Sequence, residues 1–325
     1  MVAARANVSV ATASRVLNGV PNRASFETAK RVRAAAAELN YRPVIAGQML
    51  RGQPSRLVAV VAAELANPAM AAMAASIERA LRERGLVMAL GDNHQRADLQ
   101  DEFLAEMSAY HVRAVCLIGA EPSAGLDRIR RQGTPVVFVN RPTTEDPGAA
   151  YVGIDNRRAG ADLAQHLIAR GYSRIGLIHA MLGHSASALR REGLLGELRA
   201  GGFPCHAIVE AGRPVANHLQ AGFDSMQDLL RAANPPSAVV CLTDGLAYGA
   251  HRALRERDSD REIAFYGFDD AFLNDWVAPW LNSIASPTHL YGPAVLEMFD
   301  RLVSGATGNL ETYLPHDIRL RARPF

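Results

Sequence analysis

The sequence contains very little cysteine. Its 325 residues include only Cys116, Cys205 and Cys241, and no two of them form a Cys-x-x-Cys pair. An odd number of widely spaced cysteines is not the pattern of a disulfide framework or of a cysteine-rich zinc site. Cys116 and Cys241 lie within apolar runs, which indicates buried thiols in a reducing compartment. We therefore expect a cytoplasmic protein.

Long apolar runs and targeting signals are also missing. The longest apolar stretch begins at Leu57 and is interrupted by Glu64, Asn67 and Pro68, so it is too short to span a membrane. The sequence does not open with the apolar segment of a secretory signal peptide. We expect no membrane partner.

Common catalytic and cofactor-binding motifs are absent as well. The sequence has no Gly-x-Gly-x-x-Gly, Walker loop, Gly-x-Ser-x-Gly or His-Glu-x-x-His motif. Its ten histidines are scattered, and His179 and His184 lack the spacing of metal ligands. Asp269 and Asp270 are adjacent carboxylates with no base or nucleophile beside them. We expect no enzyme activity, no cofactor and no metal.

Positive charge is concentrated at the start of the chain. Residues 1–56 carry nine basic and two acidic residues, a net charge of +7, whereas the remainder carries 26 basic and 31 acidic residues. A basic head on a mildly acidic body is typical of a DNA-binding domain attached to a regulatory domain, although a basic surface is often only solvated.

The basic segment contains a helix-turn-helix pattern. Val2–Ala6 is helical in character, and after a turn Ser9 is a good N-cap for a helix that Gly19 ends. The second helix of such a unit can enter the major groove of DNA, where an arginine reads guanine edges. Its outward residues, which would face DNA, are Val10, Ala11, Ser14, Arg15 and Asn18.

A third helix and a linker complete the head. We expect the helix over Ser25–Leu39, with Ser25 as its cap and an apolar stripe of Phe26, Ala29, Val32, Ala36 and Leu39. Pro43 ends the helix, because it disfavours the helical conformation at the residue before it. A weakly helical stretch then runs over Val44–Arg51. We therefore divide the chain into a head (1–43), a hinge or linker (44–56) and a body (57–325).

The body alternates apolar strand-like runs with amphipathic helical segments, which predicts an α/β fold with parallel sheets. The helical segments include Ala69–Arg84, Arg157–Arg170, Ala186–Ala200, Gly222–Ala233 and Leu246–Arg257. The strand-like runs are Leu57–Ala63, Leu86–Leu90, Ala114–Ile118, Pro135–Val139, Arg174–His179, Ala207–Val209, Ala238–Leu242 and Ile263–Phe268. So many strands exceed one ordinary open sheet and favour two similar lobes; a (β/α)8 barrel is the alternative.

Polar residues that directly follow strands are the candidates for ligand binding, because ligands of parallel sheets bind at the carboxyl ends of the strands. Carboxylates, amides and an arginine suit hydrogen bonding to a polyol. The alternative is that Asp155, Thr243 and Asp269 only cap the following helices. The candidates are Asn67, Asn140-Arg141, Asp155-Asn156, Thr243-Asp244 and Asp269-Asp270, with Arg190 on a helix.

These residues resemble the LacI/GalR (lactose and galactose repressor) family of transcriptional regulators along essentially the whole chain. The head is similar through Val2–Ser9, Ala11–Gly19 and Glu38–Pro43, and the body through Asn67-Pro68, Val152–Asn156, Arg190 with Gly193, Thr243-Asp244 and Gly267–Asp270. The resemblance implies a homodimer that reads a pseudo-palindromic operator. It also implies a periplasmic-binding-protein-like (type I) body, whose two lobes close on a small effector and mediate dimerisation.

The resemblance also assigns roles by position. Val10, Ala11 and Arg15 would contact base edges, and Val44–Arg51 would be a hinge helix that folds on DNA, with Leu50 wedged into the minor groove. The DNA backbone would be held by Ser9, Thr12, Ser14 and Asn18. The effector cleft would be lined by Asn67, Asp155, Arg190, Thr243 and Asp269, with Asn217 as a weaker candidate.

Three departures from the family pattern bear on these roles. Met1 stands where the first helix is already under way, so we expect either an upstream start or a destabilised head. Gly47 lowers the helix preference of the hinge. Ala69-Met70 replaces an aromatic pair that would stack on a ligand.

We therefore interpret the chain as an effector-controlled transcriptional regulator, a repressor of sugar or related carbon metabolism. A solute-binding protein of a transporter would share the body but lack the basic head. An α/β enzyme is disfavoured by the missing catalytic motifs. The sequence is compatible with an effector that releases the operator and with one that promotes its binding.

Overall fold

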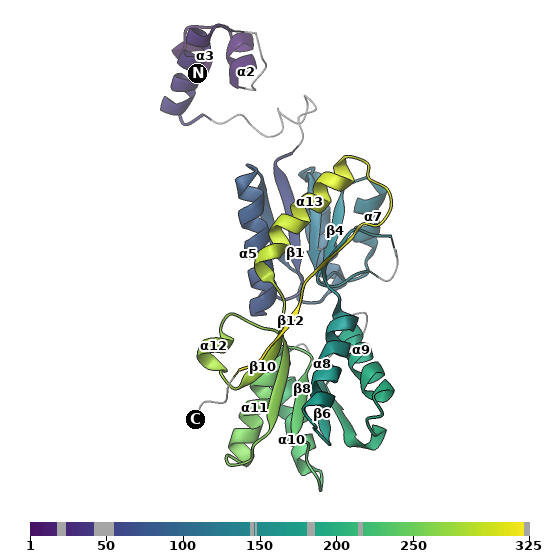
Figure 1. Ribbon diagram of the computed structural model, residues 1–325. Helices are drawn as coiled ribbons and strands as arrows, with labels where there is room; N and C mark the ends of the chain where they lie inside the picture. The colour runs from purple at the N-terminus through teal and green to yellow at the C-terminus, as the bar shows by residue number, and fades with distance from the viewer. Residues whose placement is uncertain are drawn as a thin grey trace. The chain divides into compact units, whose positions relative to one another are not determined.

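In the computed structural model, the described part of the N-terminal unit contains the helices α1 (Val2–Arg5), α2 (Val10–Leu17) and α3 (Phe26–Glu38). The predicted caps are confirmed, because the Ser9 and Ser25 hydroxyl oxygens accept hydrogen bonds from the backbone N–H groups of Thr12 (3.1 Å) and Thr28 (3.3 Å). The structure describes residues 1–17, 24–41, 55–143, 146, 148–180, 186–213 and 217–321. The chain divides into the units Met1–Arg56 and Leu57–Phe325 (Figure 1).

The core of the N-terminal unit consists of small side chains: Val2, Ala6, Ala13, Val16, Val32, Ala35 and Ala36. The expected stripe of α3 is wrong at Phe26 and Leu39, which are 79% and 40% exposed. Phe26 precedes Val32 by six residues, and at 3.6 residues per turn this places it about 120° around the helix from Val32. Leu39 is the C-cap of the helix. The predicted hinge helix Val44–Arg51 lies outside the described residues.

Two six-stranded sheets form the second unit, one in each of two lobes. The first has the order β11-β5-β4-β3-β1-β2, and the second β12-β10-β9-β8-β6-β7. All neighbouring strands are parallel except β12, which is antiparallel to β10. The strands of the first sheet are β1 (Leu57–Ala62), β2 (Val87–Asp92), β3 (Ala114–Ile118), β4 (Val136–Val139), β5 (Tyr151–Ile154) and β11 (Glu311–Leu314). Those of the second are β6 (Ile175–His179), β7 (Ile208–Gly212), β8 (Ala238–Cys241), β9 (Ala264–Asp269), β10 (Leu281–Ala285) and β12 (Asp317–Arg319).

The prediction of two lobes with parallel sheets is therefore confirmed, and the barrel alternative is wrong. All eight predicted strand-like runs form strands, whereas β5, β10, β11 and β12 are strands that the pattern did not reveal. The expected burial of Cys116 and Cys241 is also observed.

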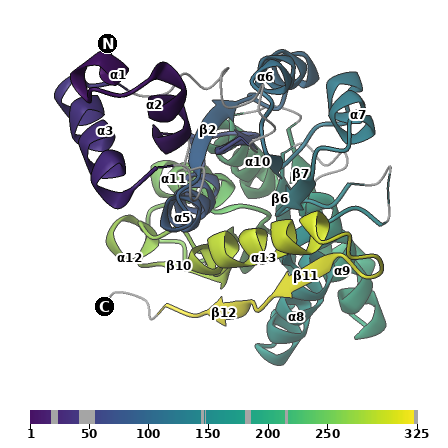
Figure 2. The same ribbon diagram turned by 90° about the horizontal axis from the view of Figure 1, so that it is seen from above.

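Helices cover both faces of each sheet. In the first lobe α5 (Pro68–Glu83) and α13 (Tyr291–Val303) lie side by side, while α6 (Ala97–Ala109) and α7 (Ala124–Arg131) cover the other face (Figure 2). Alternate residues of β1 therefore serve two cores, since Val58 and Val60 belong to one buried cluster and Ala59 and Val61 to the other. The second lobe carries α8 (Asn156–Ala169) with α9 (Ala186–Ala200) and α10 (His218–Arg231) with α11 (Asp244–Arg257).

Within the described residues, the chain crosses between the lobes three times. It passes from β5 into α8, from β10 through a short 3₁₀ turn (Thr288–Leu290) into α13, and from β11 into β12 (Figure 1). At each crossing the chain leaves the carboxyl end of a parallel strand. The carboxyl edges of the two sheets consequently face each other, which is where ligands of such sheets bind.

Paired glycines let the helices of the second lobe approach closely. A Cβ atom on Gly160 of α8 would clash with the carbonyl oxygen of Arg190, and one on Gly193 of α9 would clash with that of Arg157. Gly222 of α10 and Gly249 of α11 make the equivalent approach to the backbone at Leu246 and Leu219. The α8–α9 contact thus fixes the position of Arg190 relative to α8.

We expect Gly193→Ala to lower the free energy of unfolding by about 1–3 kcal/mol, because the added methyl group forces α8 and α9 apart. The matched control is Gly196→Ala on the same helix, where a Cβ meets nothing within 4 Å. That change removes a helix-interior glycine and should raise stability by up to about 1 kcal/mol. Urea denaturation measures both, and equal effects of the two substitutions would contradict the close packing.

Candidate functional site

Helix α2 buries one face and exposes the other. Ala13 and Val16 are buried against the neighbouring helices, whereas Val10 is 76% exposed and Ala11 and Arg15 are also exposed. The Ser9 and Thr12 hydroxyl oxygens lie 2.9 Å apart at the start of the helix. A short helix whose exposed face carries small apolar residues and an arginine, with hydroxyl groups at its N-terminus, can contact base edges and phosphates together.

A cleft lies between the two lobes of the body, at the facing carboxyl edges of the sheets. It contains about 670 Å³ of space outside protein atoms, part of which is continuous with solvent. Ten of the fifteen described residues that line it have polar side chains, and none of the fifteen is Phe, Tyr or Trp. The lining residues that can form hydrogen bonds through their side chains are Glu64, Asn67, Gln95, Asn140, Arg141, Ser187, Arg190, His218, Thr243 and Asp269.

Arg190 is the central side chain of the cleft floor. Although its side chain is only 3% exposed, its guanidinium donates three hydrogen bonds: to Asn156 Oδ1 (2.8 Å), to the Leu242 carbonyl oxygen (2.9 Å) and to Asp269 Oδ1 (3.1 Å). Its Cζ atom also lies 4.8 Å from the centroid of the Phe268 ring. A buried cation with this many partners is held in one orientation.

Asp269 faces Arg190 from an unusual backbone conformation. Its φ is +105°, and that of Asp270 is +49°, so two consecutive non-glycine residues occupy a region that L-amino acids disfavour. Burial raises the pKa of the Asp269 carboxyl, while Arg190, His218 and a hydrogen bond from Asn67 act in the opposite direction. Asn67 belongs to the other lobe, so its side chain acts on Asp269 from across the cleft.

Comparison with known proteins identifies the family. Residues 2–44 match the family model described as bacterial regulatory proteins, lacI family, and residues 58–307 match a periplasmic binding protein domain. The transcriptional regulator GntR of Pseudomonas aeruginosa is 33% identical over 308 residues, which cover 94% of this chain and 88% of GntR. The chain belongs to the LacI family. It is a transcriptional regulator with a DNA-binding helix-turn-helix head.

Solved structures agree with this assignment. A LacI-family transcriptional regulator from Silicibacter pomeroyi has a TM-score of 0.83 at 26% identity, covering 98% of this chain and 96% of that one. The complex of the transcriptional regulator CelR with cellobiose has a TM-score of 0.71 at 27% identity, covering 99% and 98% of the two chains. The predicted fold, a helix-turn-helix head on a two-lobe body of the type I periplasmic-binding-protein kind, is confirmed.

Four of the six expected effector residues of this LacI-family protein line the cleft: Asn67, Arg190, Thr243 and Asp269. Asn67 and Thr243 also cap helices, since their oxygen atoms accept hydrogen bonds from Ala69 N–H (2.9 Å) and Leu246 N–H (3.3 Å). Capping and cleft lining are therefore not alternatives at these positions. Among the expected DNA-binding residues, Asn18 and Leu50 lie outside the described residues.

Asp155 and Asn217 do not line the cleft. Both are exposed, and their side chains accept hydrogen bonds from Arg158 N–H (2.9 Å) and Gln220 N–H (3.1 Å) at the starts of α8 and α10. At these two positions the structure shows the capping role, and neither residue is among those that line the cleft.

The residue after Asp155 is the one that contacts Arg190. Asn156 is only 2% exposed, accepts a hydrogen bond from Arg190 and donates one from Nδ2 to the Asn140 carbonyl oxygen of the other lobe (3.1 Å). Asn140 itself has a φ of +65°, and its buried Oδ1 accepts no hydrogen bond from the described part of the chain. Both residues belong to polar pairs that follow strands, which was the signal available in the sequence.

No metal site or membrane span is found in the part of the chain that the structure describes. The described histidine, cysteine, aspartate and glutamate residues form no group of three or more that could hold a metal ion. Within the same ranges, no helix is both long and apolar enough to cross a membrane.

Asp244, the first residue of α11, lies beneath the cleft floor and is 3% exposed. Burial and the nearby charge of Asp269 raise the pKa of the Asp244 carboxyl from 3.8 to about 7. The folded protein therefore binds this proton more tightly than the unfolded chain does. The resulting contribution to stability is complete below about pH 4 and is lost as the pH rises through about 7.

We expect Asp244→Asn to flatten the decrease in unfolding free energy between about pH 4 and pH 7, where the carboxyl contributes up to about 4 kcal/mol. Urea denaturation at several pH values measures the slope for both proteins. The raised pKa of Asp269 acts in the same direction, so the flattening is partial. Identical slopes in the two proteins would show that Asp244 does not take up a proton in this range.

Proposed function

We propose that the protein is a dimeric repressor whose affinity for a pseudo-palindromic operator is set by a small sugar or sugar derivative in the cleft. The observation that carries the proposal is the presence, in one chain, of a helix with an exposed Arg15 face and a cleft with a fixed Arg190–Asp269 floor. In the cytoplasm of a bacterium such a protein would meet chromosomal DNA. We infer regulation rather than catalysis, in keeping with the regulators that the chain is similar to.

The chemistry of the cleft supports a polyol. Arg190, Asn67 and Thr243 supply hydrogen-bond donors, while Asp269 and Asn140 supply acceptors. Hydroxyl groups donate and accept, so a sugar satisfies both kinds of group. The similar CelR is described in complex with cellobiose. With Met70 and Ala69 where an aromatic pair would stack, recognition depends on hydrogen bonding rather than on ring contacts.

Exposed apolar side chains support the dimer. On and beside α12 (Asn274–Val277), Phe272 is 70% exposed, Trp276 84% and Val277 62%. The edge strand β2 exposes Val87 and Leu90, at 52% and 41%. An exposed apolar cluster and an apolar edge strand are features that proteins usually cover, and a second copy of the chain covers both on each subunit at once.

We expect Arg15→Ala to remove the preference for operator over random DNA, because the guanidinium would read base edges. Losing such a contact costs about 1–3 kcal/mol of binding free energy. Fluorescence anisotropy with operator and scrambled duplexes at several salt concentrations measures this. The control is Arg33→Ala on the exposed side of α3, which should weaken binding to both duplexes equally. Retained operator preference in Arg15→Ala would contradict the groove assignment.

We expect a saccharide from a panel that includes cellobiose to raise the thermal midpoint of the protein. At 100 times its dissociation constant, the bound saccharide adds about 2.7 kcal/mol to the free energy of unfolding. Asp269→Asn should abolish the shift, because it removes the carboxylate that faces Arg190. Asp155→Asn, at an exposed capping residue, is the control and should leave the shift intact. A shift that survives Asp269→Asn, or disappears in Asp155→Asn, would refute the cleft assignment.

We expect Trp276→Glu to convert the dimer to monomers at micromolar concentration, because it places a charge in the apolar surface of α12. Sedimentation velocity measures the oligomeric state. Tyr110→Glu, at an aromatic residue that is 57% exposed beyond α6, is the control and should leave the dimer intact. An unchanged dimer in Trp276→Glu would place the subunit contact elsewhere.

A further inference from the structure

One turn joins the cleft to the exposed surface of α12. It runs from Asp269 to Asn274, begins with the two positive φ angles of Asp269 and Asp270, and leads directly into α12. Non-glycine residues with such angles persist only where surrounding contacts hold them. Side chains of two groups hold this turn.

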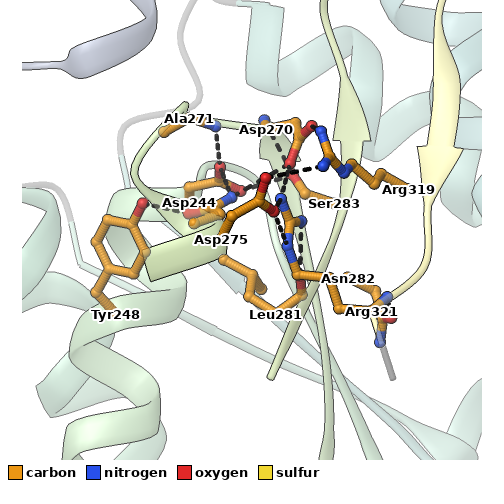
Figure 3. Close-up of polar contacts among 11 residues, drawn as sticks. Asp244, Tyr248, Asp270, Ala271, Asp275, Leu281, Asn282, Ser283, Arg319 and Arg321 are labelled. Atoms are coloured by element: carbon orange, nitrogen blue, oxygen red, sulfur yellow. Dashed lines mark hydrogen bonds and ion pairs between the residues drawn. The ribbon is translucent and has the colours of Figure 1, made fainter. Parts of the chain in front are cut away.

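Asp244 supplies the first set of contacts. Its Oδ2 accepts hydrogen bonds from the Ala271 N–H and from Asn274 Nδ2, both at 2.8 Å, and its Oδ1 accepts one from Ser283 Oγ at 2.7 Å (Figure 3). Ser283 Oγ also accepts a hydrogen bond from the Asp270 N–H (3.1 Å). The approach depends on Gly267, where a Cβ atom would clash with Asp244 Oδ1. One carboxylate thus holds both ends of the turn.

Two arginines, one at the end of the last strand and one just after it, supply the second set. Arg321 donates to Asp270 Oδ1 (2.7 Å) and to Asp275 Oδ1 (2.7 Å from Nη2 and 3.0 Å from Nε), and its side chain is only 8% exposed. Arg319 of β12 donates to Asp275 Oδ2 at 2.8 Å (Figure 3). These ion pairs connect the turn to α12, because Asp270 belongs to the former and Asp275 to the latter.

The two ends of the turn face different sites. At one end Asp269 Oδ1 accepts a hydrogen bond from Arg190 in the cleft, and at the other Asn274 begins the helix that exposes Trp276. We propose that the turn Asp269–Asn274 transmits changes at the cleft floor to the α12 surface, and that Asp244 is the positioning residue that holds it. This inference rests on the proposed function for the identity of the cleft as the effector site and of α12 as the subunit contact.

The contacts of Asp244 make the turn sensitive to protonation. All three of its partners donate hydrogen bonds to the ionised carboxylate, whereas on protonation either the contact with Ser283 Oγ reverses its direction or one of the two N–H contacts is lost. Burial favours the proton and the donors oppose it. The titratable and charged groups near Asp244 and the turn are Cys241, Tyr248, Asp269, Asp270, Asp275, Arg190, His218, Arg319 and Arg321.

Trp276 provides a direct reporter of the turn. The chain contains two tryptophans, and Trp280→Phe leaves Trp276 alone. In that background we expect the Trp276 emission maximum to shift as the pH is lowered from 9 to 5. Adding Asp244→Asn should give the shifted spectrum at every pH and abolish the transition. The control Asp260→Asn, at an exposed residue of the same lobe, should leave the transition unchanged.

The same spectrum and pH profile with and without Asp244→Asn would overturn the inference. Far-UV circular dichroism shows whether Asp244→Asn is folded. If it is not, Ser283→Ala, which removes one donor to the same carboxylate, replaces it in the same measurement. Loss of the transition on Asp260→Asn would likewise count against a specific role for Asp244.

Coupling between the cleft and α12 is tested by a double-mutant cycle on the dimer dissociation constant at pH 8. We expect Asp269→Asn to change this constant by about five-fold or more, a typical magnitude of coupling between sites, and to have no further effect once Asp244→Asn is present. No effect of Asp269→Asn, or the same effect in both backgrounds, would overturn the inference. A parent chain that is monomeric at all concentrations would refute the proposed dimer, and the Trp276 profile would then decide the inference alone.

Discussion

The buried guanidinium of Arg190 is the constraint on which the cleft depends. A cation that is removed from water costs several kcal/mol unless hydrogen bonds and an opposite charge replace its hydration. Here three segments replace it: the start of α8 through Asn156, the carboxyl end of β8 through Leu242, and the carboxyl end of β9 through Asp269. These segments cannot move independently without leaving the charge unpaired.

The same constraint explains features that lie further away. The close contact of α8 and α9 at Gly160 and Gly193 sets the position of Arg190, because the clash that a larger residue would cause is with the Arg190 carbonyl group itself. Asn156 extends the network to Asn140 in the other lobe. The unfavourable φ angles at Asp269 and Asp270 follow from bringing a carboxylate to Arg190 at the end of a strand, and Asp244 and Arg321 hold the turn that results.

The sequence alone predicted those parts of the structure that local contacts determine. Ser9 and Ser25 were predicted as caps because a cap bonds within its own first turn. Eight of the twelve described strands were predicted because they are short apolar runs. In contrast, β10 was missed because Asn282 and Ser283 interrupt its apolar pattern, and these polar groups serve Phe265 and Asp244, which are distant in the sequence.

Prediction of the site met the same limit. Polar pairs after strands located the cleft, but the choice between Asp155 and Asn156 depends on which of two adjacent side chains turns back to cap the helix. A shift of one residue changes the direction of a side chain on a helix by about 100°. The partners of Asp270 were not predictable in this way, because Arg321 lies 51 residues further along the chain.

The central claim is that the cleft and the DNA-binding face are energetically coupled. Reciprocal titrations at one salt concentration test it most directly: operator affinity with and without a saturating saccharide that raises the thermal midpoint, and affinity for that saccharide with and without operator. The account predicts that both ratios differ from one by the same factor, about 5 to 150, because coupling between two sites is reciprocal. Ratios equal to one would contradict it.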